Sequence, residues 1–540
     1  MGLKLSRIFL WGFALFSQLS PPLACAETAP RPFVRHFIRP VEHLNPFTQT
    51  GYVGTSIGGL VFDTLLSQDS DTWKIGPSLA ERWQISPDLK TYALFLRKDA
   101  VFSDGQPVTA EDIKFTFEAH RDARYKSIRM PDFLGQGATV SLKDAHTVLF
   151  TLEKPNHRFL DFLVSFWVLP RHFYGDTSRE AEWPKKMIGS GPYEVKKFVT
   201  GSRTEFHKRP DWWGNKAGEF KGKHNFERIT FRYVSDLSIA NELLIAGEID
   251  LVEIFDPQNY FDLLSRLKSG QKVLAVKADG VAMPGEVGLK LNFRNPLFQD
   301  QRVRKAMVQL FDREMVNEKL FRGIYRVKTG PWGQVGPNAD ASVKPLPFDP
   351  KGAQKLLWAA GWKDSNQDGL LEKIIEGKEV PLRFTLMIIH PSFQKLATLY
   401  KEAARAVGIE VMVKQVHPQE SYRLLTENNF DTYLFDRAWS DLDPDLEKNY
   451  HSRFADDLRS LNSVGYKNPA LDPLLEEHTK TKDYKKRQAL ARKIFRMLAE
   501  DLVEIPLFEE RYALYGVSTR IKRPKDSLKF RIGFDSWADK

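Results

Sequence analysis

Hydrophobic and polar positions follow two different periods along this chain. Residues 91–97 alternate between apolar and polar side chains, which predicts a half-buried strand, and polar turns bound this segment at residues 86–88 and 103–105. After the second turn, Thr109 and Asp112 have the spacing of a capping box, so we expect a helix to begin there.

Apolar residues recur with helical spacing in the second half of the chain. An aspartate precedes each of four such segments and can cap the helix that follows: Asp300, Asp312, Asp349 and Asp483. A helical segment over residues 391–408 leads into strand-like residues 409–413. This half is therefore expected to alternate helices and strands, which is typical of an α/β fold.

One segment near the N-terminus shows neither period. Residues 51–59 are small and rich in glycine. The more apolar residues 60–66 follow directly. We therefore expect the glycine-rich segment to lead into a helix over residues 60–66.

The first 26 residues have the composition of a secretory signal. Two basic residues precede an apolar run over residues 8–16, and small residues around Cys25 suit cleavage before Glu27. A lipid anchor on Cys25 is the alternative, but we disfavour it because Pro22 occupies the position where such signals usually carry leucine. Cys25 is the one cysteine of the chain, so the mature protein would contain no disulfide.

Length and charge narrow the class of protein further. The chain has 540 residues, which exceeds one typical domain, so at least two domains are expected. The net charge is +10, of which Lys4 and Arg7 in the signal supply two. Because no nucleic-acid-binding motif accompanies this charge, we expect a solvated basic surface and no nucleic-acid partner. No segment after the signal is apolar for long enough to cross a membrane.

One motif suggests hydrolytic chemistry. Residues 54–58 match the G-x-S-x-G pattern of α/β-hydrolases, with Ser56 in the position of the nucleophile. That nucleophile needs a buried strand before it, whereas residues 45–53 are polar and broken by proline and glycine. A secreted serine hydrolase is therefore a minor alternative.

A second motif suggests calcium. Residues 364–369 open like an EF-hand loop, yet the twelfth position is Ile375, where a bidentate glutamate is required. A plain turn is the expected structure, and calcium is an alternative because Glu372 and Glu376 are nearby. The histidines are scattered and have no cysteine partners, so neither a metal site nor a cofactor is expected.

Several short motifs occur in a fixed order along the mature chain. They are Leu44-Asn45-Pro46, the segment 79–118 with its turns and capping box, the Gly/Pro turn at 188–193, residues 209–214, and the junction at 246–251 where a helix stops and a strand begins. Together they resemble the family 5 extracellular solute-binding proteins, the oligopeptide- and dipeptide-binding components of ABC importers. Residues 222–227 and 533–537 are similar to the microcin C-type and related oligopeptide-binding branch.

This resemblance implies a fold and its domains. It implies an α/β periplasmic binding protein of type II (cluster C), with two lobes, an extra subdomain and a two-strand hinge. The expected ranges are 1–26 for the signal peptide, 27–70, 187–288 and 508–540 for lobe I, 71–186 for subdomain Ib, and 289–507 for lobe II. The mature protein is expected to be a periplasmic monomer without enzymatic activity.

The resemblance also implies ligand-binding residues after a buried strand at residues 430–438. Peptide-binding relatives carry a tryptophan there, followed by an aspartate that pairs with the α-ammonium group of the peptide. Asp441 corresponds to that aspartate, although its spacing from Trp439 is one residue tighter, so Asp443 is an open alternative. A carboxylate enclosed in a cleft is costly unless a cation joins it, which makes an amine-bearing ligand suitable. Both aspartates could instead only form the turn before Pro444.

Three further positions are implied by the same resemblance. Dipeptide binders carry an arginine pair where this chain has Gln394-Lys395, and Lys395 could act as a point charge for the carboxylate of a ligand but not as a bidentate clamp. Thr50 and Tyr52 fall where relatives bring groups of the first lobe to the cleft. The missing arginine pair argues for a ligand longer than a dipeptide, or a modified one.

The expected function is capture of oligopeptides or peptide-like compounds and delivery to an ABC permease and its ATPase at the inner membrane. Two alternatives remain open. The same fold could bind a nickel chelate, haem, an oligosaccharide or an opine, and Ser56 could belong to a secreted hydrolase.

Overall fold

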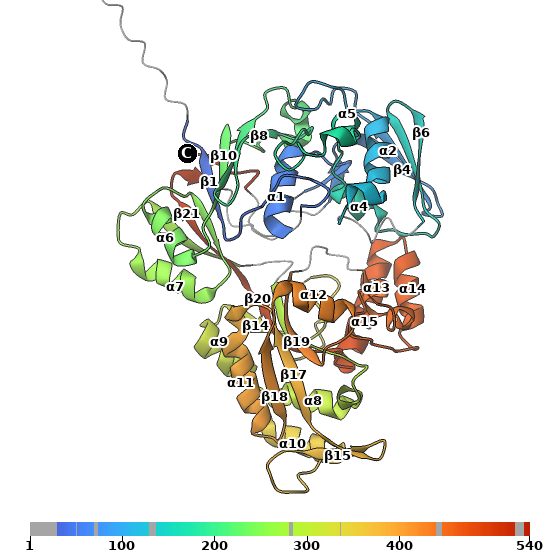
Figure 1. Cartoon of the computed structure of the whole chain (residues 1–540), viewed down its shortest axis with the longest axis vertical. Helices are drawn as coiled ribbons and strands as arrows, with labels where there is room; N and C mark the ends of the chain where they lie inside the picture. Colours follow the sequence, from blue (N-terminus) through green and yellow to red (C-terminus); the bar gives the residue numbers. More distant parts are fainter. Residues whose placement is uncertain are drawn as a thin grey trace, which may run out of the picture. The chain divides into compact units, whose positions relative to one another are not determined.

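Three larger sheets organise the fold. The computed structural model describes residues 30–49, 51–69, 74–128, 137–279, 285–334, 336–438, 445–458, 460–523 and 534–540 (Figure 1). Within these ranges the sheets have seven, four and six strands, and three two-stranded ribbons accompany them: β2 (Leu66–Gln68) with β3 (Ile75–Pro77), β15 (Glu372–Ile375) with β16 (Lys378–Pro381), and β22 (Ile521–Lys522) with β23 (Ala538–Asp539).

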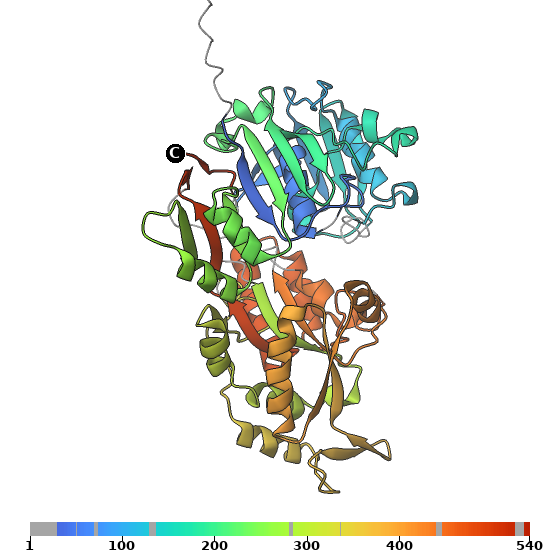
Figure 2. The same cartoon turned by 60° about the vertical axis from the view of Figure 1, so that its left-hand side comes forward.

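The seven-stranded sheet combines segments from both ends of the chain. Its order is β12-β21-β11-β1-β10-β9-β8, with β1 (Phe33–Phe37), β8 (Tyr193–Val199), β9 (Arg203–Lys208), β10 (Arg228–Tyr233), β11 (Leu251–Ile254), β12 (Val273–Asp279) and β21 (Tyr512–Ser518). β1 runs parallel to β10 and β11, whereas β21 is antiparallel to both β11 and β12. Figure 2 shows β21, in red, beside the green β12.

Hydrophobic cores cover both faces of this sheet. Phe33 and Phe37 of β1 belong to one core, and Val34 between them belongs to another. The helix α1 (Gly51–Val61) packs in the first core, and α6 (Leu237–Ile245) with α7 (Pro257–Arg266) packs in the second. Because neighbouring residues of β1 face opposite cores, all five residues of this strand are buried, Arg35 and His36 included.

The four-stranded sheet shares the first of these cores. Its order is β4-β5-β7-β6, with β4 (Ala80–Ile85), β5 (Thr91–Leu96), β6 (Thr139–Asp144) and β7 (Thr147–Thr151). The helices α2 (Ala110–Ala119), α4 (Phe159–Ser165) and α5 (Arg171–Tyr174) belong to the same part of the chain. The predicted strand over 91–97 is confirmed by β5. Asp112 accepts a hydrogen bond from the backbone N–H of Thr109 at 2.8 Å, as the predicted capping box requires.

The six-stranded sheet contains the alternating helices and strands predicted for the second half. Its order is β14-β20-β13-β19-β17-β18, with β13 (Gly285–Leu291), β14 (Tyr325–Val327), β17 (Arg383–Ile388), β18 (Glu410–Gln415), β19 (Thr432–Ala438) and β20 (Glu504–Glu510). A core with residues of α8 (Gln301–Gln309), α9 (Arg313–Phe321), α10 (Pro350–Ala359) and α11 (Gln394–Arg405) packs on it. A further core unites α13 (Leu446–Tyr450), α14 (Asp472–Lys480) and α15 (Tyr484–Glu500), and α12 (Pro418–Thr426) precedes β19.

The predicted aspartate caps of this half are confirmed. The side chains of Asp300, Asp312, Asp349 and Asp483 each accept a backbone N–H of the first turn of α8, α9, α10 and α15, respectively. A side-chain acceptor at this position satisfies one of the four backbone donors that a helix leaves unpaired at its N-terminus.

The predicted helix over residues 60–66 is wrong. The glycine-rich segment itself is helical, since α1 runs from Gly51 to Val61, and β2 begins at Leu66. Gly58 packs so closely on Trp167 that an added Cβ would lie 1.9 Å from the indole ring. Gly54, one turn earlier, faces the side chain of Gln49 in the same way. Tertiary packing therefore requires small residues here and overrides the weak helix propensity of glycine.

Buried Arg209 joins three of the motifs found in the sequence. Its guanidinium donates to four backbone carbonyls at 3.1–3.2 Å, those of Val101, Phe102, Gly189 and Gly191. It also donates to the carboxylate of Asp211 at 2.8 Å. Arg209 is only 2% exposed, so these acceptors replace the water that the charge loses on burial. The turn at 103–105, the turn at 188–193 and residues 209–214 are thereby held at one point.

A buried carboxylate lies close to the same point. Asp63 accepts hydrogen bonds from the indole N–H groups of Trp212 and Trp213, the second at 2.7 Å. Burial raises the pKa of Asp63 to about 7, although these two donors favour the ionised form. This carboxylate ties the end of α1 to the tryptophan pair that follows Arg209.

We predict that Arg209→Met lowers the free energy of unfolding by about 3 kcal/mol or more, because four backbone carbonyls lose a charged donor, and only those of Gly189 and Phe102 keep a backbone donor among the described residues. Chemical denaturation followed by circular dichroism measures this loss. Arg203→Met is the matched control, since the side chain of Arg203 is 40% exposed and pairs with Glu205, and it should cost less than about 1 kcal/mol. Equal losses for the two variants would contradict the role given to Arg209.

Candidate functional site

The chain passes between the seven-stranded and the six-stranded sheet twice. It leaves the first sheet after β12, which ends at Asp279, and enters the second with β13, which begins at Gly285. It returns between β20 and β21, which Arg511 alone separates. β12 pairs with β21 and β13 pairs with β20, both antiparallel, so the two connections join strands that are neighbours in each sheet.

The carboxyl ends of three parallel strands mark one edge of the six-stranded sheet. β17 is parallel to β18 on one side and to β19 on the other. Ligands of open α/β sheets bind beyond such ends. The predicted residues Trp439, Asp441 and Asp443 follow β19 directly, but they lie outside the described residues. Their role in ligand binding stays a prediction.

The loops after β17 and β18 reach the same edge. Lys395 lies there in the first turn of α11 and is exposed. His390 and His417 cap the helical turns that follow their strands, because the Nδ1 atom of each accepts a backbone N–H. A neutral imidazole that accepts at Nδ1 carries its proton on Nε2. This edge therefore offers one exposed cation and two hydrogen-bond donors.

The candidate residue of the first sheet, Tyr52, is part of a charged network. Its hydroxyl accepts from Arg35 and donates to Glu253 at 2.9 Å, and Arg35 also pairs with Glu253 at 3.1 Å. Arg35 lies on β1 and Glu253 on β11, whereas Tyr52 is in the first turn of α1 and 40% exposed. The network thus fixes Tyr52 against the parallel strands of this sheet. Thr50, the other candidate near it, lies outside the described residues.

Sequence reasoning missed Arg35 and Glu253. Arg35 is 3% exposed, and its guanidinium lies over the rings of Phe37, Tyr52 and Phe534 at 4.8–5.5 Å from their centroids. The available signal was its place between Phe33 and Phe37, because a charge at an inward position of an apolar strand needs a buried partner.

A second network of buried charges lies where β13, β20 and the end of β14 meet. Lys328 binds Glu286 at 2.8 Å and also binds Glu504, whose other oxygen binds Lys290 at 2.5 Å. Two acids and two bases are thereby balanced, and each of the four side chains is at most 10% exposed. Loss of one partner from such a set leaves an uncompensated buried charge.

Glu509 adds a third acid to this region. It lies opposite Glu286 in the register of β13 and β20, and it is fully buried. Arg326 pairs with it at 2.7 Å, and the backbone N–H of Gln334 donates to it at 2.9 Å. Burial, with a smaller contribution from Glu286, raises the pKa of Glu509 to about 7. This carboxyl group therefore titrates near neutral pH.

A model of the bacterial extracellular solute-binding proteins, family 5 Middle, matches residues 74–456. The chain belongs to this family. Family membership confirms the resemblance drawn from the sequence motifs, and the proteins of this family bind substrates outside the cytoplasm.

Similar proteins agree with this family and with its fold. The oligopeptide-binding protein AppA of Bacillus subtilis is 27% identical over 467 residues, which cover 85% of this chain and 82% of AppA. The structure of AppA in complex with a nonapeptide matches with a TM-score of 0.77 and 24% identity, over 94% of this chain and 99% of that chain. NikA from Brucella suis in complex with Fe(III)-EDTA matches with a TM-score of 0.78 and 22% identity, over 95% and 100%. The predicted α/β fold of type II periplasmic binding proteins is thereby confirmed.

The described residues of this solute-binding protein include no helix that is both long and apolar enough to cross a membrane. Ser56, the candidate nucleophile, lies in the middle of α1, where its hydroxyl donates to the backbone carbonyl of Tyr52 at 2.8 Å. A nucleophile elbow requires a sharp turn from a strand into a helix. Ser56 does not have that geometry.

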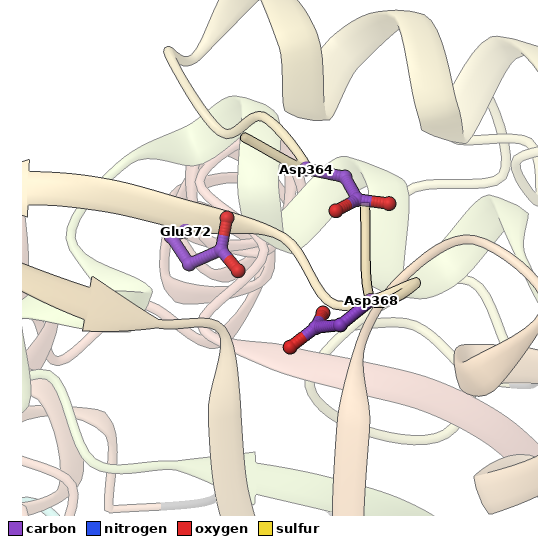
Figure 3. A group of neighbouring side chains, drawn as sticks. All are labelled: Asp364, Asp368 and Glu372. Carbon is purple, nitrogen blue, oxygen red and sulfur yellow. The ribbon is translucent and has the colours of Figure 1, made fainter. Parts of the chain in front are cut away.

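The predicted turn at residues 364–369 brings three carboxylates together. Figure 3 shows Asp364, Asp368 and Glu372, whose nearest oxygens lie within 4.8 Å of one another. Asp364 accepts the backbone N–H of Gly369 at 3.1 Å, and Glu372 accepts the N–H and the hydroxyl of Ser365, both at 3.1 Å. These carboxylates thus serve as acceptors within the turn, and the calcium alternative gains no further support from this geometry.

We predict that Glu509 makes this solute-binding protein less stable as the pH rises. The folded protein holds the proton of Glu509 up to about pH 7, whereas an unfolded glutamate releases it near pH 4.3, so folding becomes less favourable between these values. Glu509→Gln removes this dependence and should exceed the wild type in free energy of unfolding by about 3 kcal/mol at pH 8, with little difference near pH 4. Urea denaturation at a series of pH values measures the difference.

Asp63 gives the wild type a similar slope, so the comparison between wild type and variant is the decisive quantity. Glu318→Gln is the control, because Glu318 is an exposed glutamate. Stability curves of Glu509→Gln and wild type that run parallel over the whole pH range would contradict the assignment.

Proposed function

We propose that this solute-binding protein captures oligopeptides or peptide-like compounds between two lobes and delivers them to an ABC permease and its ATPase at the inner membrane. The observation that supports this most is its similarity to the oligopeptide-binding protein AppA over 85% of the chain. The structure of AppA with a bound nonapeptide has the same fold. Because the chain is similar to a peptide-binding protein over most of its length, a peptide is the first ligand to test.

Two lobes supply the motion that capture needs. We propose lobe I at 27–70, 187–288 and 508–540, subdomain Ib at 71–186, and lobe II at 289–507. The sheets are consistent with this division, although β13 already begins at Gly285. Two neighbouring connections between the sheets can bend together as a hinge. A ligand that contacts both lobes only when they are closed then shifts the population towards the closed state.

The ligand would bind in extended form. Backbone hydrogen bonds of the strand type do not depend on side chains, and wet pockets tolerate side chains of different size. Micromolar affinity requires about −8 kcal/mol, which one ion pair and several backbone hydrogen bonds can supply. The protein would then bind peptides of many sequences with micromolar affinity.

The two ends of the peptide would meet opposite charges. Asp441, with Asp443 as the alternative, would pair with the α-ammonium group beside Trp439. Lys395 lies in the first turn of α11, where the helix dipole also favours an anion, so it suits the carboxylate of the ligand. Tyr52 and Thr50 would contribute from the first lobe.

The protein would release its ligand unchanged. A monomer exported through the cleavable signal at residues 1–26 would act in the periplasm, without a lipid on Cys25. Ser56 is held inside a helix and bonded to a backbone carbonyl, so it lacks the geometry of a nucleophile. Binding without chemistry also agrees with a family that is defined by solute capture.

A metal chelate is the second candidate ligand, because NikA with Fe(III)-EDTA shares the fold. His390 and His417 stand at the ends of adjacent strands, but each uses Nδ1 as an acceptor and keeps its proton on Nε2. Neither ring then offers a free lone pair to a metal. Calorimetry with Fe(III)-EDTA and with trialanine in parallel separates the two candidates.

We predict that Asp441→Ala weakens the binding of trialanine at least about tenfold, since the buried ammonium group loses its counter-ion. Isothermal titration calorimetry measures the dissociation constant. Asp457→Ala is the matched control, because Asp457 is an exposed aspartate. An unchanged affinity of Asp441→Ala, together with a tenfold loss in Asp443→Ala, would transfer the role to Asp443. If neither variant changes the affinity, this loop is not the amine site.

We also predict that peptides leave the protein intact. Native mass spectrometry of the freshly purified protein should show co-purified peptides, and a nonapeptide incubated with the protein should be recovered with its mass unchanged. Cleavage of the nonapeptide, or labelling of Ser56 by a serine-directed phosphonate, would contradict a pure binding function.

A further inference from the structure

A cavity of about 470 Å³ lies beyond the carboxyl end of β13. Phe293 and Arg294, which follow this strand directly, line it together with residues from the start of α8 and the end of α15. The seven residues of β13 span roughly 20 Å, so the cavity is separated by that distance from the crossing at Gly285. It is therefore distinct from the candidate ligand site and from the hinge.

The side chain of Arg294 is held in place at this cavity. Its Nη1 donates to the side-chain oxygen of Asn292 at 3.2 Å and to the carbonyl of Ser463 at 3.0 Å, and its Nη2 donates to the carbonyl of Ala455. The guanidinium packs against Gly465, where an added Cβ would lie 2.7 Å from Cζ. A glycine with a positive φ angle thus makes room for the cation.

Arg294 retains hydrogen-bonding capacity. A guanidinium has five N–H donors, and three of them have the acceptors just named. Within the described ranges, Nε–H and one N–H of Nη2 have no protein acceptor. Burial lowers the pKa of Arg294, whereas the charge of Asp456 raises it by a smaller amount.

A second arginine and a lysine make the wall basic. Arg304 lies 4.9 Å from the ring centroid of Phe293 and donates to the backbone carbonyl of Asp501, and burial lowers its pKa as well. Lys467, more than half exposed, stands at the cavity and pairs with Asp456 at 2.7 Å. Three basic side chains thus share this cavity with two acidic ones.

The two acids are already engaged. Asp501 accepts from the hydroxyl of Tyr466 and from the side-chain amide of Asn468 at 2.9 Å. Asp456 pairs with Lys467 and also interacts electrostatically with Arg294. A cationic ligand would have to compete with these bonds, whereas an anionic ligand would meet donors that have no protein acceptor.

We propose that this cavity binds a small organic anion, whose carboxylate or phosphate group is held by Arg294, with Lys467 at the entrance. The volume is within the range of small-molecule sites. A planar guanidinium with two neighbouring N–H groups matches the two oxygens of a carboxylate or phosphate. The site goes beyond the capture of peptides and does not depend on it.

Calorimetric titration at low ionic strength tests the proposal, with citrate and inorganic phosphate as probes. We expect submillimolar binding of at least one probe, weakened at least about tenfold in Arg294→Gln and about threefold in Lys467→Gln. Arg302→Gln and Lys480→Gln are the controls, because both residues are exposed and ion-paired on helices of the same half. Their affinities should stay within about twofold of wild type. A higher affinity for citrate than for phosphate identifies a carboxylate site, and a higher affinity for phosphate identifies a phosphate site.

The proposal is overturned if neither probe binds below about 10 mM, or if all four variants weaken binding equally. If Arg294→Gln fails to fold, the result for Lys467→Gln tests the proposal instead. Lys467 is on the surface, so this variant should fold, and its affinity for the probe should still be lower than that of the wild type. Trialanine binding is measured on the same samples. A loss of citrate binding with unchanged trialanine affinity supports a separate site, and failure of trialanine binding in the wild type refutes only the peptide function.

Discussion

The fold depends on two strands that follow each other directly and belong to different sheets. β20 pairs with β13 in the six-stranded sheet, β21 pairs with β11 and β12 in the seven-stranded sheet, and Arg511 alone lies between them. The register of β20 in one sheet therefore limits the possible register of β21 in the other sheet. The buried ion pairs of Lys328 with Glu286 and Glu504 join β13 to β20 inside the six-stranded sheet.

Local signals predicted much of the fold because they do not depend on distant contacts. Asp300 and Asp312 cap their helices through the backbone of the next turn, so their spacing from apolar residues was sufficient. The helix α1 could not be predicted in this way. Gly54 and Gly58 lie on one helical face that packs on Gln49 and Trp167, and the second contact spans more than a hundred positions of the chain. Glycine has a low helix propensity, but in α1 it allows these two close contacts.

The candidate site was less predictable for a related reason. Tyr52 was found through its place in a family motif, whereas the charges that hold it, Arg35 and Glu253, are more than two hundred residues apart. Arg209 likewise reads as an ordinary basic residue after a strand until its four carbonyl acceptors are brought together. Propensity and periodicity describe neighbours in sequence, and these side chains owe their function to neighbours in space.

The position of β21 has a consequence for biogenesis. This strand is formed by residues 512–518 near the end of the chain, yet it occupies an interior place in the sheet, between β12 and β11. A nascent chain without it cannot join β12 to the rest of the sheet, so the edges of β11 and β12 that face β21 remain unpaired until residues 512–518 have been made. The seven-stranded sheet is therefore completed only after every strand of the six-stranded sheet has been made.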